Sequence, residues 1–463
     1  MRSFQLIIFA ILIQFSLSAQ KITGDWHGEI GGGKNKIQFI FHIANTDEGL
    51  AATMDIPARN LTGIKTQKTT FQDNQLHIDG KNFGFEYKGA FRKDSVNIEG
   101  HFIEGPNQVP LKLYPGPGDV VEKRVRPQEP TKPYPYKEEE VVFENTKDNV
   151  KLAGTLTIPM TGKKHPVAIL ITGSGPQNRD EEIFGHKPFL VLADHLTKLG
   201  IAVLRYDDRG VNESTGNFTE ATSADFATDV ESAIDYLKTR SDIDKKQIGL
   251  IGHSEGGIIA PMVAARSKDV DFMVLLAGTG VSGFETNLIQ SVTLRKFPVP
   301  DEEAYKNFIT DVLTISSADK DVKEVRQELT DYYNKSPFFE AMAGQSPQRD
   351  EILKGLVEAR TTPWVRYFYH YNPADMIEKV KCPVLSINGT KDQQVVADVN
   401  QAGIRAALEK GKNKDYQVIA LEGLNHFFQT AETGAMNEYD DIEETFSPEA
   451  LTLVSDWILK RIK

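Results

Sequence analysis

A short glycine-rich segment carries the strongest chemical signal in this sequence. It reads Gly252-His253-Ser254-Glu255-Gly256-Gly257 and stands between two apolar runs, at 248–251 and 258–265. A strand that turns sharply into a helix at the pattern G-x-S-x-G is typical of a nucleophile elbow, which lifts the serine hydroxyl out of a sheet. Glycine suits such a turn because larger side chains would collide with nearby backbone. We therefore expect Ser254 to be a nucleophile; the alternative is a structural serine in a tight turn.

A serine nucleophile needs a general base, because its hydroxyl is almost fully protonated at neutral pH. In folds with this elbow, an acid and then a histidine follow the serine along the chain. Only His370 and His426 follow Ser254. His426 comes directly after the strand-like run 417–421, in a loop that could hang over the elbow, whereas His370 belongs to an aromatic cluster. We expect His426 to be the base and His370 to contribute packing or a substrate contact.

The acid that orients the base should follow the preceding strand. Asp392 comes shortly after the apolar run 384–387, and its carboxylate would hold the imidazole tautomer and stabilise the imidazolium. We expect Asp392 in this role, with Asp398 in reserve; the alternative is a solvated aspartate in a turn.

Acyl transfer also needs backbone N–H groups that stabilise an oxyanion. The glycine-rich turn Gly173-Ser174-Gly175 follows an apolar run at 167–172, so the amides of Ser174 and Glu255 are the candidate donors.

Charged residues are also concentrated at 205–214. An internally paired loop that braces the site explains this cluster better than a subsite for a substrate carboxylate.

The chain divides into segments that differ in their residue patterns. Residues 1–19 place Arg2 before an apolar stretch and small residues, as in a secretory signal peptide, with an uncleaved anchor as the alternative. Short alternating segments predict a small antiparallel β domain, a sandwich or barrel-like sheet, over residues 20–114. Prolines indicate a linker over residues 115–138. The remaining residues, 139–463, form the domain that holds the candidate site.

Apolar strands alternate with helices in this last domain, which predicts an α/β fold with a mostly parallel sheet and helices on both faces. The strand-like runs 272–276 and 384–387 are separated by about a hundred residues with helical periodicity, and a connection that long should have structure of its own. We therefore expect a helical lid insertion at about 280–375.

Composition excludes some partners. The formal net charge is −12 and the pI is near 5.4, which argues against nucleic acid or an anionic membrane as the main partner. We expect a periplasmic or secreted protein with no membrane span once the signal peptide is removed. Cys382 is the only cysteine and is expected to be a core thiol. The sequence does not indicate the oligomeric state.

From about Val141 to its end, the chain resembles α/β-hydrolases of the serine-aminopeptidase-like and dienelactone-hydrolase-like groups, especially exported bacterial carboxylesterases with a β-rich N-terminal domain. The resemblance rests on five motifs: Thr172-Gly173-Ser174-Gly175-Pro176, Tyr206-Asp207-Asp208-Arg209-Gly210, Gly252 to Gly257, Cys382 to Asp392, and Asn425-His426. It implies the α/β-hydrolase fold and acyl transfer to water. Many relatives have His-Gly where this chain has Thr172-Gly173, which makes Ser174 a weaker assignment than the triad.

These observations favour a serine hydrolase that cleaves short-chain carboxylic esters, acetyl esters included, through an acyl-enzyme intermediate. An exported aminopeptidase or prolyl-type serine peptidase is the second hypothesis, and a non-catalytic ligand-binding protein is the third. No cofactor or metal is expected, because the sequence has no metal-ligand cluster, phosphate loop or dinucleotide fingerprint.

Overall fold

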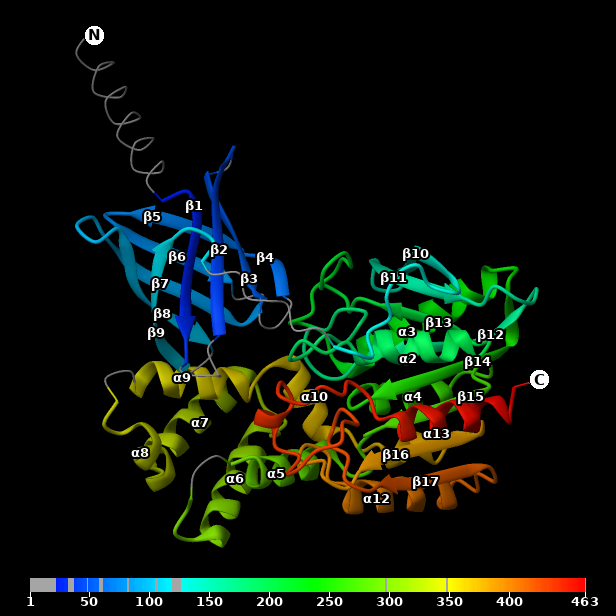
Figure 1. Ribbon diagram of the computed structural model, residues 1–463. Helices are drawn as coiled ribbons and strands as arrows, with labels where there is room; N and C mark the ends of the chain where they lie inside the picture. The colour runs from blue at the N-terminus through cyan, green and yellow to red at the C-terminus, as the bar shows by residue number, and fades with distance from the viewer. Residues whose placement is uncertain are drawn as a thin grey trace. The chain divides into compact units, whose positions relative to one another are not determined.

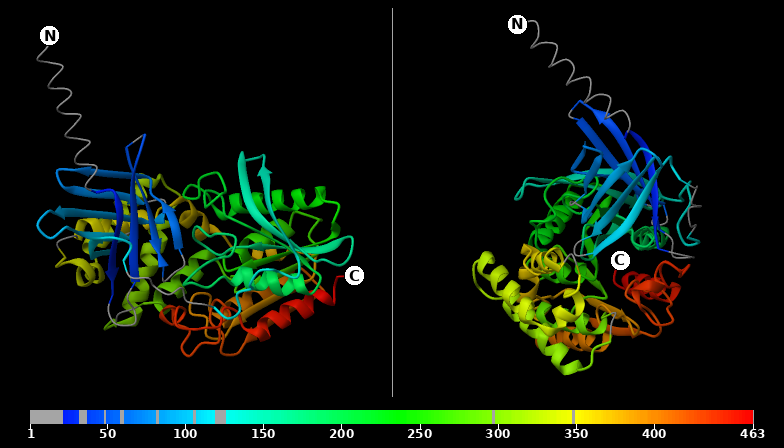
Figure 2. Two further views of the ribbon diagram at one scale, coloured as in Figure 1. Left: turned by 45° about the horizontal axis from the view of Figure 1, so that its top comes forward. Right: turned by 90° about the vertical axis from the view of Figure 1, so that its left-hand side faces the viewer.

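The computed structural model describes residues 22–31, 37–47, 49–57, 61–80, 83–104, 107–118, 126–295, 298–346 and 349–462. They belong to two compact units (Figures 1 and 2). The first unit comprises residues 1–124 and 343–359, and the second comprises residues 125–342 and 360–463. The predicted signal peptide lies outside the described residues.

The strands of the first unit form an antiparallel β meander. Its strands are β1 (Gly24–Ile30), β2 (Ile37–Thr46), β3 (Gly49–Ile56), β4 (Leu61–Lys65), β5 (Lys68–Gln72), β6 (Gln75–Gly80), β7 (Phe85–Arg92), β8 (Asn97–Glu104) and β9 (Asn107–Pro115). They form one sheet in the order β4-β3-β2-β1-β9-β8-β7-β6-β5. Alternate residues face a common interior, as Leu76 and Ile78 do in β6. The sheet curls into a half-barrel (Figure 1), which confirms the antiparallel β domain in its barrel-like form.

The second unit contains an eight-stranded sheet. Its strands are β10 (Lys137–Asn145), β11 (Val150–Ile158), β12 (His165–Ile171), β13 (Ala202–Tyr206), β14 (Ile243–His253), β15 (Phe272–Leu276), β16 (Val384–Gly389) and β17 (Tyr416–Leu421). Their order is β10-β11-β13-β12-β14-β15-β16-β17. The pairings of β10 with β11 and of β11 with β13 are antiparallel, and all the others are parallel. The carboxyl-terminal ends of β12, β14, β16 and β17 therefore lie at one edge of the sheet.

Helices cover both faces of this sheet. Along β12, Val167, Ile169 and Ile171 pack into one core, and Ala168 and Leu170 pack into another. The first core includes residues of α3 (Ser223–Thr239), α4 (Gly256–Ala264) and α12 (Ala397–Lys410), and the second includes residues of α2 (Pro188–Lys198) and α13 (Pro448–Leu459). This arrangement confirms the predicted α/β-hydrolase fold.

A run of helices connects β15 to β16. They are α5 (Gly283–Thr293), α6 (Glu302–Ser316), α7 (Val322–Lys335), α8 (Pro337–Ala343), α9 (Arg349–Ala359), α10 (Pro363–His370) and α11 (Ala374–Ile377). Amphipathic periodicity explains them, since α7 buries Val325, Leu329 and Tyr333 on one side. The predicted helical insertion is therefore present. Within the described residues, no helix is long and apolar enough to cross a membrane.

Candidate active site

Ser254 lies on a sharp turn between β14 and α4. Its φ angle is 51°, a left-handed conformation that a residue with a side chain adopts only when its surroundings hold it there. The Ser254 N–H donates a hydrogen bond to the carbonyl of Leu276 at the end of β15, at 2.8 Å. The neighbouring strand thus holds the turn in place.

The glycines around Ser254 are needed because backbone passes very close to them. A Cβ atom on Gly252 would lie 2.0 Å from the carbonyl oxygen of Gly256, and one on Gly256 would lie 2.1 Å from that of Ile171. Any side chain at either position would overlap these atoms. The glycine pattern therefore lets the elbow, residues 252–257, sit directly against the end of β12.

His426 and Asp392 form a buried pair after β17 and β16. Nδ1 of His426 lies 2.7 Å from Oδ2 of Asp392, and both side chains are almost fully buried. The other carboxylate oxygen accepts the N–H groups of Gln394 and Val395, each at 2.8 Å. Asp392 is therefore fixed as an acceptor for Nδ1–H of His426, which leaves Nε2 of a neutral imidazole as a proton acceptor.

The loop that carries His426, residues 422–430, is held by the side chain of Asn425. Its Oδ1 accepts the N–H groups of Phe427 and Gln429, at 3.0 and 2.9 Å, and its Nδ2 donates to Oε1 of Gln429 at 2.8 Å. Phe428 has a φ angle of 60°. These contacts explain why an asparagine precedes the histidine, and we call this segment the base loop.

The base loop lies against the elbow. Nε2 of His253, the residue before Ser254, lies 3.0 Å from the carbonyl oxygen of His426, and the two imidazole rings are 4.8 Å apart between centroids. The structure therefore gathers Ser254, Asp392 and His426 at one edge of the sheet. Their catalytic roles remain a prediction.

The predicted oxyanion donors come from two segments at the same place. Gly173 follows β12, and a Cβ atom on it would lie 3.3 Å from Cβ of Ser254. The N–H of Gly173 donates to Oε1 of Glu181 at 2.6 Å. The N–H groups of Ser174 and Glu255 make no hydrogen bond within the described part of the chain. We call residues 173–175 the oxyanion turn.

His370 and the reserve acid Asp398 do not belong to the buried pair. His370 is exposed at the last position of α10, and Asp398 is exposed in the first turn of α12. Cys382 is half-buried before β16, where burial raises the pKa of its thiol to about 12. This thiol is therefore uncharged at neutral pH and unsuited to be a nucleophile.

Sequence reasoning missed two residues beside the elbow, Glu181 and Trp364. Glu181 bonds both Gly173 and His253. Nε1–H of Trp364, in α10, donates to Oε1 of Glu255 at 2.6 Å, and the Ser223 hydroxyl donates to the same oxygen at 2.6 Å. No periodicity or short motif marks either residue, because their partners come from distant segments. The contact of Trp364 shows that the helical insertion reaches the elbow.

A small cavity lies behind the oxyanion turn. Its lining includes Thr172, Gly173, Asp208, Phe218, Phe226 and Glu255. Burial raises the pKa of Asp208 well above its ordinary range, against the opposing hydrogen bonds from the Thr172 hydroxyl and the Gln177 N–H. Burial also raises the pKa of Glu255, against the hydrogen bonds from Ser223 and Trp364. The carboxyl groups that line this cavity are therefore already bonded to protein donors.

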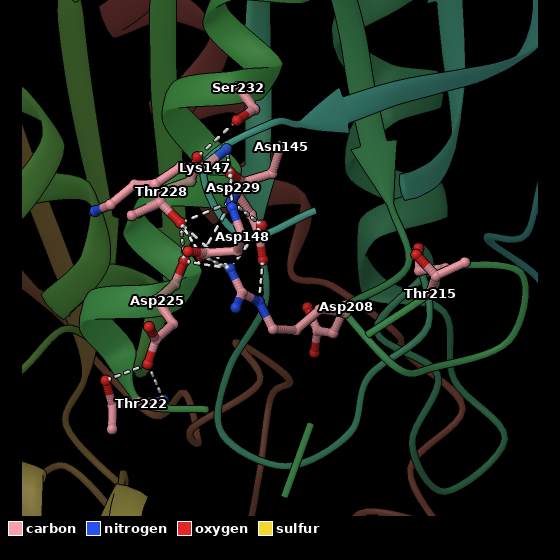
Figure 3. Close-up of polar contacts among 12 residues, drawn as sticks. Asn145, Lys147, Asp148, Asp208, Thr215, Thr222, Asp225, Thr228, Asp229 and Ser232 are labelled. Carbon is pink, nitrogen blue, oxygen red and sulfur yellow. Dashed lines mark hydrogen bonds and ion pairs between the residues drawn. The ribbon is translucent and has the colours of Figure 1, made fainter. Parts of the chain in front are cut away.

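The charged residues of the loop at 205–214 are paired, and their charged partners lie outside the loop. Nε of Arg209 donates to Asp229 at 2.7 Å, and its NH2 group donates to Asp148 at 2.9 Å. Asp148, Thr228 and Asp229 gather around this guanidinium (Figure 3). Asp207 is likewise bonded to Arg179, at 2.7 Å. The loop thus braces the region between α3 and the oxyanion turn through ion pairs with other segments, and not through the internal pairs that were expected.

Comparisons with known proteins extend these observations. The family model described as X-Pro dipeptidyl-peptidase (S15 family) matches residues 148–402, a range that contains Ser254 and Asp392. Esterase EstD of Thermotoga maritima is 26% identical over 284 residues, which are 61% of this chain and 59% of EstD. The chain therefore spans less than two thirds of the length of that relative.

Solved structures of esterases are similar at low identity. Est1E of Butyrivibrio proteoclasticus, with ferulic acid bound, is 18% identical, and the similarity covers 69% of this chain and 98% of that one with a TM-score of 0.40. Esterase Pf2001 of Pyrococcus furiosus is 16% identical over 70% of this chain and 93% of its own, with a TM-score of 0.43. The fold itself rests on the strand order and helix layers described above.

Proposed function

This chain belongs to the X-Pro dipeptidyl-peptidase (S15) family, and on that premise we propose that it is a serine hydrolase that cleaves short-chain carboxylic esters. The observation that carries the proposal is the buried Asp392–His426 pair, at 2.7 Å, beside a strained serine on a nucleophile elbow. The similarity to esterase EstD favours an ester as the substrate.

The proposed reaction has two halves. In the first, the Ser254 oxygen attacks the ester carbonyl while Nε2 of His426 takes the hydroxyl proton. The N–H groups of Ser174 and Glu255 stabilise the oxyanion of the tetrahedral intermediate. His426 then gives its proton to the leaving alkoxide, so an alcohol departs and the acyl group stays on Ser254. In the second half, water attacks this acyl group with His426 again as the base. His426 then returns the proton to the Ser254 oxygen as the bond to the acyl carbon breaks, so a carboxylic acid leaves and the serine is restored.

A prolyl-type peptidase is the second candidate, and the description of the matching family favours it. Such an enzyme binds the ammonium group of a peptide N-terminus, for which an ionised carboxylate is the natural partner. Near the elbow, Glu181 faces His253, Asp208 accepts from Thr172, and Glu255 accepts from Ser223. Because these carboxyl groups already have protein partners, the site favours the ester over the peptide.

Substrate panels test the choice. We expect turnover of p-nitrophenyl acetate and butyrate to exceed turnover of X-Pro p-nitroanilides by at least about 100-fold in kcat/KM, which is about 2.7 kcal/mol of transition-state binding. Ser254→Ala is the control and should abolish both activities. Activity confined to the anilides would overturn the esterase proposal in favour of the peptidase.

A further inference from the structure

Glu181 and His253 form a buried pair that the proposed reaction does not use. Nδ1 of His253 lies 2.8 Å from Oε1 of Glu181, and the two side chains are 4% and 2% exposed. The same carboxylate oxygen accepts the N–H of Gly173 at 2.6 Å. The other ring nitrogen of His253 lies 3.0 Å from the carbonyl oxygen of His426.

The partners of His253 define its protons. A carbonyl oxygen only accepts hydrogen bonds, so Nε2 of His253 carries a proton and donates a hydrogen bond to the carbonyl oxygen of His426. Nδ1 faces a carboxylate oxygen, which also accepts from Gly173, and therefore donates as well when Glu181 is ionised. Both ring nitrogens are thus used to join separate segments of the chain.

Three segments meet at this pair. Glu181 bonds the oxyanion turn through Gly173, His253 belongs to the elbow, and His426 belongs to the base loop. Space between them is scarce, because a Cβ atom on Gly173 would lie 3.1 Å from Oε1 of Glu181 and 3.3 Å from Cβ of Ser254. A small shift of Glu181 would therefore move the turn against the nucleophile.

The backbone of Glu181 supports the same conclusion independently. Its φ angle is 51°, in the left-handed region, although glutamate has no local advantage there. Such strain persists only where the surrounding contacts over-determine the conformation, and it gathers at functional sites. Ser254, which the pair adjoins, is strained in the same way.

Resting on the proposed function, we infer that Glu181 and His253 are positioning residues that hold the oxyanion turn, the elbow and the base loop in one arrangement for acyl transfer. Glu181 accepts the N–H of Gly173, so the next amide along the chain, that of Ser174, stays available to bond the substrate. His253, the residue before Ser254, holds the backbone carbonyl of His426 and so fixes the base loop against the elbow.

Two conservative variants separate reach from charge. Glu181→Gln loses the negative charge but keeps the length, so its amide oxygen can take the place of Oε1, which accepts from both Gly173 and His253. Glu181→Asp keeps the charge but is one methylene shorter, so it cannot reach both partners without moving the turn. A structural displacement of this size costs about 100-fold in rate.

We expect kcat for p-nitrophenyl acetate to fall about 100-fold in Glu181→Asp and less than about 10-fold in Glu181→Gln, with KM within about 3-fold of wild type in both. The rate of acylation by a fluorophosphonate should follow the same order. Leu237→Ala, a core variant in α3, controls for destabilisation and should keep the wild-type kcat per folded molecule.

The reverse order, equal losses in the two variants, or wild-type kcat in both would overturn the positioning role. An equal loss in Leu237→Ala would overturn it too, since general destabilisation would then explain the effect. Failure of the wild-type protein to react with the fluorophosphonate would instead contradict the proposed function, which keeps the two failures distinct.

Discussion

The contact between Asp392 and His426 is the single pairwise interaction on which the proposed chemistry depends most. Two backbone N–H groups hold one oxygen of Asp392, so the other oxygen has a fixed direction toward Nδ1 of His426. A carboxylate so placed selects the tautomer in which Nε2 can accept a proton.

Asp392→Asn should therefore lower kcat about 10³- to 10⁴-fold, because an amide can donate to Nδ1 and stabilise the wrong tautomer. KM and the circular dichroism spectrum should stay close to wild type. Asp398→Asn is the matched control, since Asp398 is exposed in α12, and its kcat should not change. A loss in Asp398→Asn with full activity in Asp392→Asn would reassign the acid.

The His253–Glu181 pair also predicts how stability depends on pH. Burial lowers the pKa of His253, but the charge and hydrogen bond of Glu181 outweigh it and raise the pKa above the ordinary value of 6.5. A raised folded-state pKa contributes stability that is fully present below pH 6.5 and is lost as pH rises through the folded value.

Unfolding free energies from urea titrations between pH 6 and 9 check this expectation. The difference between wild type and Glu181→Gln should be largest at pH 6 and shrink as pH rises, because only the wild type stabilises the imidazolium. A difference that grows with pH would have the wrong sign for a raised histidine pKa.

The roles of single residues differed in how well the sequence predicts them. Ser254 could be predicted because the glycines two residues away on either side form a short motif between a strand-like run and a helix-like run. Glu181 could not, because its partners lie 8 and 72 residues away. Glu181 is the middle residue of the acidic run Asp180-Glu181-Glu182, and such a run in a polar loop has no local signature that separates it from solvated acids.

Among the elements, α10 is the one that joins the helical insertion to the elbow. Trp364 stacks on Phe368, with ring centroids 5.0 Å apart, and donates its indole N–H to Glu255. Since Glu255 is buried, this donor helps to satisfy a carboxyl group that could not otherwise be solvated.

Trp364→Phe keeps an aromatic ring but removes the donor, so it should lower the free energy of unfolding by about 1–3 kcal/mol. The matched control is Trp457→Phe in α13. Its indole nitrogen is buried with no hydrogen-bond partner in the described part of the chain. This variant therefore loses ring volume but no hydrogen bond, and its loss of unfolding free energy should be about 1 kcal/mol smaller than that of Trp364→Phe. Equal losses in urea denaturation would contradict the bonded role of Trp364.

Elements were more predictable than their arrangement. Alternating apolar strands and helices predict the layers, because every buried parallel strand needs apolar residues on both faces. The order β11-β13-β12-β14 was not predicted. Strand order depends on which connection crosses over which neighbour, and periodicity within one strand carries no information about that crossing.

For the molecule as a whole, the net charge of −12 is the property with a kinetic consequence. A negative field slows the approach of anionic substrates and is screened by salt. We expect kcat/KM for a succinate half-ester of p-nitrophenol to rise roughly two- to five-fold between 10 and 300 mM salt, while p-nitrophenyl acetate changes little. A parallel response of both esters would show that the field does not act on the substrate.

Covalent labelling tests the central claim, that Ser254 is an acylated nucleophile, most directly. The full-length protein is treated with a fluorophosphonate, and the adduct is located by peptide mass spectrometry. The proposed function predicts one adduct, on Ser254, that forms in the wild type and is absent from Ser254→Ala. A correctly folded wild-type protein that stays unlabelled, or an adduct that persists in Ser254→Ala, would contradict it.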